Sequence, residues 1–162
     1  EFFTILDLAV IDRRAAERLQ QLLQLAEREL AHLLLTDRRL FSEPFTPARA
    51  VQLERDPDLA ERVDAFVARF GRLQDTLGDK ALPTYLVAHG ERIATFIDNL
   101  DRAERLGLIR DAQQWMDMRK LRNLMIREYV EDPAVLASAL QAAHAFVAEL
   151  AAVVERLRSA AS

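Results

Sequence analysis

Apolar residues recur every three or four positions along most of the chain, which is the spacing of one face of an α-helix. This pattern predicts long helices over about 12–35, 57–77, 83–106, 111–131 and 133–157, and a short helix over about 47–54. Residues 2–11 are also apolar, and they fit either an extension of the first helix or an arm docked on the fold.

Cap and stop signals support these boundaries. Thr46-Pro47, Asp56-Pro57 and Asp132-Pro133 each place a side-chain acceptor before a proline, which is typical of an N-cap followed by the first helical residue. Gly78 and Gly107 follow apolar stripes and predict helix ends. The connections between the last three long helices are short, so we expect these helices to be sequential antiparallel neighbours.

The apolar stripe of the last helix repeats about every 3.5 residues, which favours packing at about 20° in an antiparallel bundle. The chain has 162 residues, 51% of them apolar, which is enough to bury a substantial core. No repeat, low-complexity tract or long linker divides it. We therefore predict an all-α fold, an antiparallel four- or five-helix up-and-down bundle, with residues 1–162 forming a single domain.

The amino-acid composition limits the kinds of functional site that the chain can form. The chain has no cysteine, which excludes disulfides, zinc–thiolate sites and a cysteine nucleophile. The net charge of −4 gives no global attraction for nucleic acid, yet 20 of the 22 basic residues are arginine. Any anion site would therefore be built from forked guanidinium groups. No uninterrupted apolar run reaches the length of about 18 residues that a membrane span needs, and no signal pattern opens the chain, so we expect a cytoplasmic protein.

The three histidines do not form a metal site in the sequence. His32 follows a glutamate by three residues, which is half of the ligand set of a di-iron helical bundle. The second half is missing, because Leu86 precedes His89 and Gln141 precedes His144 at the same spacing. There is also no glycine-rich phosphate loop. We predict neither a metal nor a cofactor.

The stretch from Asp117 to Tyr129 carries the most informative pattern. Four cations fall between positions 119 and 127, and Arg122 and Tyr129 share a helix face with apolar residues. An arginine on an apolar stripe needs a partner, because burying an unpaired guanidinium is costly. One interpretation is structural, either a salt bridge to a neighbouring helix or an arginine whose charged end snorkels to solvent. The other is an anion site, in which Arg122 binds a phosphate and Tyr129 adds a hydroxyl.

The segment from Leu121 to Pro133 resembles the signature of HEPN-domain proteins, and more narrowly that of the HepT-like proteins, also described as nucleotidyltransferase substrate-binding subunits. Their motif is Arg, four residues, His, one residue and Tyr, usually beginning Arg-Asn. Arg122, Asn123 and Tyr129 match it. Residues 70–80, and residues 106–108 together with Trp115, also look like members of one branch of this family, so the resemblance spans roughly residues 60–155.

This resemblance implies a helical bundle that forms a homodimer, with the motif in a cleft at the dimer interface. Active HepT-like proteins are metal-independent ribonuclease toxins, paired with a small MNT-type nucleotidyltransferase as antitoxin. In some members the partner transfers AMP to the motif tyrosine, here Tyr129. The implied catalytic residues are Arg122, Arg127 and Tyr129, and the implied binding residues are Asn123 and Arg119.

The chain departs from the motif at one position, because Arg127 replaces the histidine. Arginine stays protonated and has no acceptor lone pair, so it cannot act as a general base. Losing general acid–base catalysis typically lowers a rate by about 10²–10⁴-fold. Positions 122 and 127 are also about 140° apart on an ideal helix. Three interpretations remain open: a weakened ribonuclease that binds RNA, a non-catalytic substrate-binding subunit of a nucleotidyltransferase, and a purely structural helical dimer.

Overall fold

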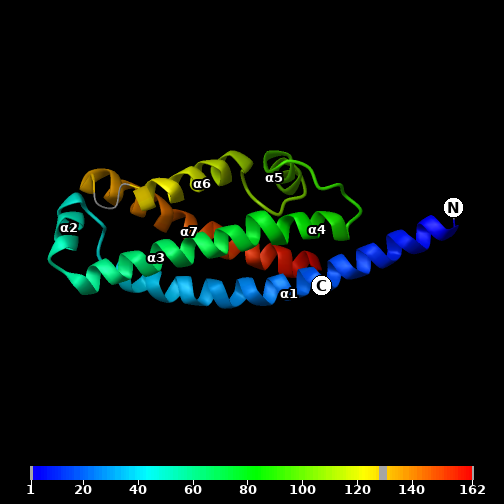
Figure 1. Cartoon of the computed structure of the whole chain (residues 1–162), viewed down its shortest axis with the longest axis horizontal. Helices are drawn as coiled ribbons and strands as arrows, with labels where there is room; N and C mark the ends of the chain where they lie inside the picture. The colour runs from blue at the N-terminus through cyan, green and yellow to red at the C-terminus, as the bar shows by residue number, and fades with distance from the viewer. Residues whose placement is uncertain (1, 128–130, 162) are drawn as a thin grey trace.

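The computed structural model describes residues 2–127 and 131–161, with side chains described from residue 13 onward, and this part of the chain is all-α (Figure 1). The elements are α1 (Phe2–Leu40), α2 (Pro47–Val51), the 3₁₀-helix η1 (Gln52–Glu54), α3 (Pro57–Asp75), the π-helix η2 (Thr76–Ala81), α4 (Leu82–Ala88), α5 (Phe96–Arg105), α6 (Ala112–Arg127) and α7 (Pro133–Ala161).

Four long helical segments form the body of the molecule. α1, the continuous segment α3–η2–α4, then α6 and finally α7 run alternately up and down, and short α2 and α5 lie at opposite ends (Figure 1). The predicted antiparallel up-and-down bundle is therefore confirmed. The ambiguous residues 2–11 belong to α1, which continues through them without a break.

The predicted helix over 83–106 is wrong, because the chain breaks between α4 and α5. Gly90 has φ of 78°, a left-handed conformation that favours glycine and stops α4. Thr95 then starts α5, and its hydroxyl accepts a hydrogen bond from the Asp98 amide at 3.2 Å.

The predicted helix end at Gly78 is also wrong, because the chain continues through η2 into α4. Gly78 is buried in η2, and a Cβ added there would lie 3.4 Å from Cζ3 of Trp115. The glycine therefore makes room for a ring from α6 instead of ending a helix.

The predicted N-caps are present. The Thr46 hydroxyl accepts from the Arg49 amide at 3.2 Å, and the Asp56 carboxylate accepts from the Leu59 amide at 3.1 Å. Asp132 accepts from the amides of the first turn of α7. These bonds satisfy amides that have no partner within their own helix.

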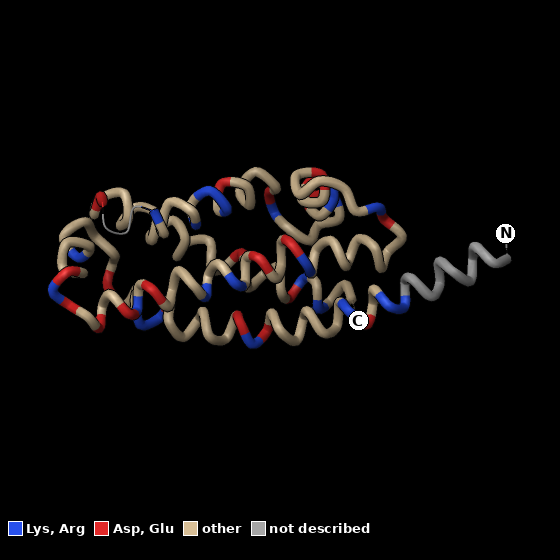
Figure 2. Tube along the Cα trace, viewed as in Figure 1, with Lys and Arg blue, Asp and Glu red and all other residues tan. Residues whose placement is uncertain are grey.

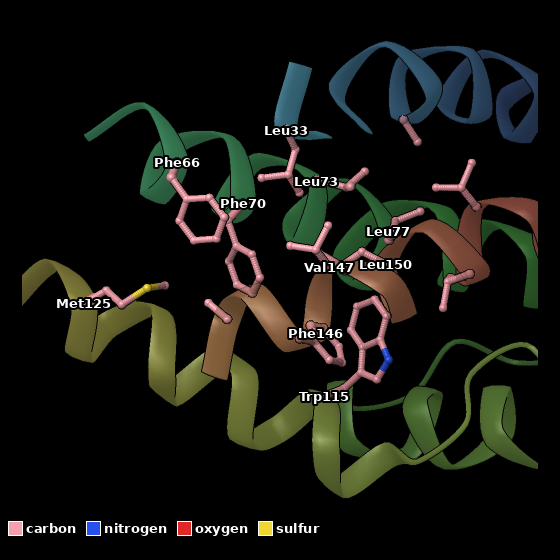
Figure 3. Packing of buried hydrophobic residues seen from close by; sticks show 14 of the residues in the cluster. Leu33, Phe66, Phe70, Leu73, Leu77, Trp115, Met125, Phe146, Val147 and Leu150 are labelled. Atoms are coloured by element: carbon pink, nitrogen blue, oxygen red, sulfur yellow. The ribbon is translucent and has the colours of Figure 1, made fainter. Parts of the chain in front are cut away.

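The core lies where α1, α3, α6 and α7 meet (Figure 3). Trp115 of α6 packs edge-on against Phe146 of α7, with ring centroids 5.5 Å apart. Phe70 of α3 joins the same aromatic group at 6.3 Å from Phe146. This packing fixes the position of α6 against α3, and the candidate site lies between these two helices.

α7 is the one described helix that is long and apolar enough to cross a membrane by length and composition. Half of its most apolar stretch is buried inside the bundle. Its inward residues include Leu140, Val147 and Leu150, all fully or almost fully buried. The role of α7 as the core helix accounts for its apolar composition.

Candidate functional site between α3 and α6

One face of α6 packs into the core, and the basic side chains between positions 119 and 127 lie outside that face. Trp115 and Met125 are buried, and Met118 is partly buried against the core. Ile126, one of the apolar residues predicted to share a helix face with Arg122, is 61% exposed. It lies on the α3 side of α6, where no described element covers it.

Arg122 is held by two residues of α3. Its Nη1 donates to Oδ1 of Asp75, and its side chain is 27% exposed. A Cβ added to Gly71 would lie 3.0 Å from Nε and 3.2 Å from Cδ of Arg122. The glycine thus lets the guanidinium lie against the backbone of α3, while Asp75, one turn later, fixes its direction.

The Arg122–Asp75 pair lies at the surface. The salt bridge to a neighbouring helix that the sequence offered as one interpretation is therefore present, and the side chain of Asp75 in it is 42% exposed. An exposed pair of this kind contributes about 0–1 kcal/mol to stability. The pair therefore positions Arg122 more than it stabilises the fold.

Beside this pair lies a cleft of about 510 Å³, which we call the α3–α6 cleft. It is lined by Asp64, Val67, Ala68, Gly71, Arg72, Asp75, Arg122, Met125 and Ile126. The walls are mostly apolar, and four charged side chains stand among them. A cleft of this size and chemistry can hold an anionic group on Arg122 together with an apolar or planar body.

Arg119 lies one turn before Arg122 but does not line the α3–α6 cleft. Its guanidinium carbon is 4.1 Å from the ring centroid of Phe96, and its Nη1 is 3.5 Å from Oδ1 of Asp79. Asp75 and Asp79 are one turn apart, so each carboxylate meets one arginine of α6. Arg119 is thereby engaged with α5 and η2.

The other predicted site residues lie toward the end of α6. Asn123 is exposed, and Arg127, the last residue of α6, is exposed as well. Neither lines the α3–α6 cleft. Tyr129 lies outside the described residues, so its expected position beside Arg122 stays a prediction.

The histidines lie apart from the α3–α6 cleft. His144 places Nδ1 at 2.7 Å from Oδ1 of Asp37 and stacks on Phe41 with ring centroids 4.2 Å apart. His89 stacks on Tyr85. Among the described residues, no group of three or more carboxylate and histidine side chains is arranged to hold a metal ion.

Sequence reasoning identified Arg122 but missed Gly71 and Asp75 as the residues that hold it. Both fall in the segment 70–80 that carries part of the family resemblance. A glycine inside a strongly periodic helix, followed four residues later by a carboxylate, is the signal that could have found them.

Comparison with protein-family models, with curated proteins and with solved structures finds no match for this chain. The resemblance to HepT-like proteins therefore depends on the residues quoted above.

Proposed function

We propose that this chain is a HepT-like component of a toxin–antitoxin or nucleotidyltransferase pair, which binds an RNA phosphate through Arg122 and cleaves RNA weakly. The observation that supports this is the placement of Arg122, half-buried at the edge of an open cleft and held from one side by Asp75. The protein would act in the cytoplasm as a homodimer.

The chemistry of the site favours binding over cleavage. A guanidinium has five N–H donors, and the hydrogen bond to Asp75 uses one of its nitrogens. The remaining donors match the oxygens of a phosphate and would stabilise its charge. Cleavage also requires a group that takes the proton from the ribose 2′-hydroxyl. Arg127 occupies the position of the family's histidine and cannot accept that proton.

A second candidate function has its own support. The apolar walls of the α3–α6 cleft and the exposed Ile126 are suited to contact with a protein. On this hypothesis the chain is a non-catalytic substrate-binding subunit of an MNT-type nucleotidyltransferase, and Tyr129 accepts AMP from the partner.

RNA binding by the full chain tests the first proposal. Fluorescence anisotropy with a short labelled single-stranded RNA compares the wild type with Arg122→Gln, and we expect an affinity loss of about tenfold, typical of one charge-assisted contact. Arg28→Gln is the matched control, because Arg28 is exposed on α1 away from the cleft. Equal affinity of the Arg122→Gln variant and the wild type would contradict the proposal.

Mass spectrometry separates the second function from the first. The chain is co-expressed with an MNT-type nucleotidyltransferase and incubated with ATP. We expect a mass increase in multiples of AMP that the Tyr129→Phe variant lacks. Ile126→Glu should weaken the complex, whereas Val51→Glu, at a residue that is 60% exposed and outside the cleft, should not.

A further inference from the structure

A second cavity lies between α1 and α3 and shares no lining residue with the α3–α6 cleft. It has a volume of about 330 Å³. Its polar lining consists of Thr36 and Arg39 from α1 and of Asp58, Glu61, Arg62 and Arg69 from α3. Basic and acidic residues are interspersed along the parts of α1 and α3 that form it (Figure 2). We call it the α1–α3 cavity.

Arg69 is held in place in this cavity by neutral groups. Its Nη1 donates to the hydroxyl of Thr36 and, at 3.0 Å, to the carbonyl oxygen of His32. Thr36 is only 5% exposed, so the anchor is part of the packed α1–α3 interface. No carboxylate in the described residues lies within ion-pair distance of Arg69, so its charge remains available to a ligand.

The other charged groups of the cavity are unpaired within the described part of the chain. The side chains of Arg39 and Arg62 make no hydrogen bond or ion pair there, and the same is true of Asp58 and Glu61. By contrast, the arginines at 119, 122 and 156 each have a carboxylate partner. Five charged side chains, of which Arg39, Asp58 and Glu61 are exposed to solvent, therefore line this surface cavity without forming an ion pair with one another.

We propose that the α1–α3 cavity binds a small phosphate monoester that also carries hydroxyl groups, such as a sugar phosphate. The three guanidinium groups supply forked donors that match phosphate oxygens. The carboxylates of Asp58 and Glu61 can only accept hydrogen bonds, so they require donors, and hydroxyl groups provide them. A bare anion would be repelled by the carboxylates, and a neutral sugar would leave the guanidinium groups without an anionic partner.

The size of the cavity agrees with this ligand class, because small-molecule sites begin at about 300 Å³. The inference does not rest on the proposed RNA or nucleotidyltransferase function. It uses neither Arg122 nor any other residue of the α3–α6 cleft.

Isothermal titration calorimetry on the full chain tests the inference with three probes: ribose 5-phosphate, ribose and inorganic phosphate. We expect ribose 5-phosphate to bind at least about tenfold more tightly than inorganic phosphate, and ribose to show no saturable binding. Arg39→Gln and Arg62→Gln should each weaken ribose 5-phosphate binding by about tenfold, which corresponds to loss of one charge-assisted contact. These variants remove no hydrogen bond or ion pair within the described residues, so we expect them to fold normally.

Two further variants complete the experiment. Glu61→Ala should reduce the preference for ribose 5-phosphate over inorganic phosphate, because a hydroxyl acceptor is lost. Arg28→Gln removes an exposed arginine of α1 outside the cavity and should bind like the wild type. The proposal is overturned if ribose 5-phosphate shows no saturable binding, if inorganic phosphate binds equally tightly, or if the Arg39 and Arg62 variants keep wild-type affinity.

Discussion

At the scale of single residues, Asp75 has two opposite effects on Arg122. It directs the guanidinium toward the edge of the α3–α6 cleft, and it also occupies one of the donor nitrogens that an anion would use. Because Asp75 is 42% exposed, water screens the pair, and its contribution to stability is about 0–1 kcal/mol. The pair can therefore open for a ligand at little cost.

Because Asp75 both orients Arg122 and competes with an anion for its donors, the substitution Asp75→Asn should change RNA affinity. The substitution removes a negative charge beside the proposed phosphate site, so we expect RNA affinity to rise about threefold to tenfold, while stability falls by about 1 kcal/mol or less. Anisotropy titration and urea denaturation measure the two quantities. Asp79→Asn is the control, because Asp79 pairs with Arg119, outside the cleft. A fall in RNA affinity for Asp75→Asn would show that Asp75 orients Arg122 more than it competes.

Arg127 gives a second prediction at this scale. Arg127→His restores a side chain that can exchange protons near neutral pH, so we expect RNA cleavage to increase by about 10²-fold or more over the wild type. Cleavage of a labelled RNA on a denaturing gel measures the gain. Arg127→Gln removes the charge without adding a base, so we expect its cleavage to be no higher than that of the wild type. If the histidine variant is no more active than the glutamine variant, the ribonuclease part of the proposed function is wrong.

At the scale of helices, the sequence predicted periodic segments well and their interruptions poorly. The break at Gly90 and the continuation through Gly78 were missed, because both glycines look alike in sequence. Gly90 adopts a left-handed conformation, whereas Gly78 stays helical beneath Trp115. In the same way Arg122 was identifiable from its own helix, but its partner Asp75 lies 47 residues away and is set by tertiary packing.

The contact between α1 and α7 gives a prediction about stability. Asp37 is only 9% exposed, and His144 supplies its hydrogen bond across the interface. His144→Ala leaves this carboxylate without that partner and removes the stack on Phe41, so we expect a loss of about 1–3 kcal/mol in unfolding free energy. Urea denaturation measures it. His32→Ala, at an exposed position on α1, should change stability by less than about 0.5 kcal/mol. Equal stabilities of the two variants would show that the His144–Asp37 bond contributes nothing.

At the scale of the whole molecule, the net charge of −4 means that RNA would have to be bound by a local patch against a weakly repulsive background. The cationic stretch of α6 is the densest such patch in the sequence, but Arg119 is already engaged with Asp79 and Phe96. Only a few phosphates can then be contacted. We accordingly expect binding that depends less steeply on salt than binding by a strongly basic protein.

The salt dependence of RNA binding is therefore a quantitative test of the proposed contacts. For single strands the slope of log affinity against log salt is about −0.7 per phosphate neutralised. Contacts from Arg122 and Arg127 to two phosphates predict a slope of about −1.4, measured by anisotropy between about 0.05 and 0.2 M salt. Arg122→Gln should reduce the slope by about 0.7, and Arg28→Gln should leave it unchanged. A slope of about −4 or steeper would require a wide basic surface in place of the α3–α6 cleft, and an unchanged slope in Arg122→Gln would remove Arg122 from the RNA contact.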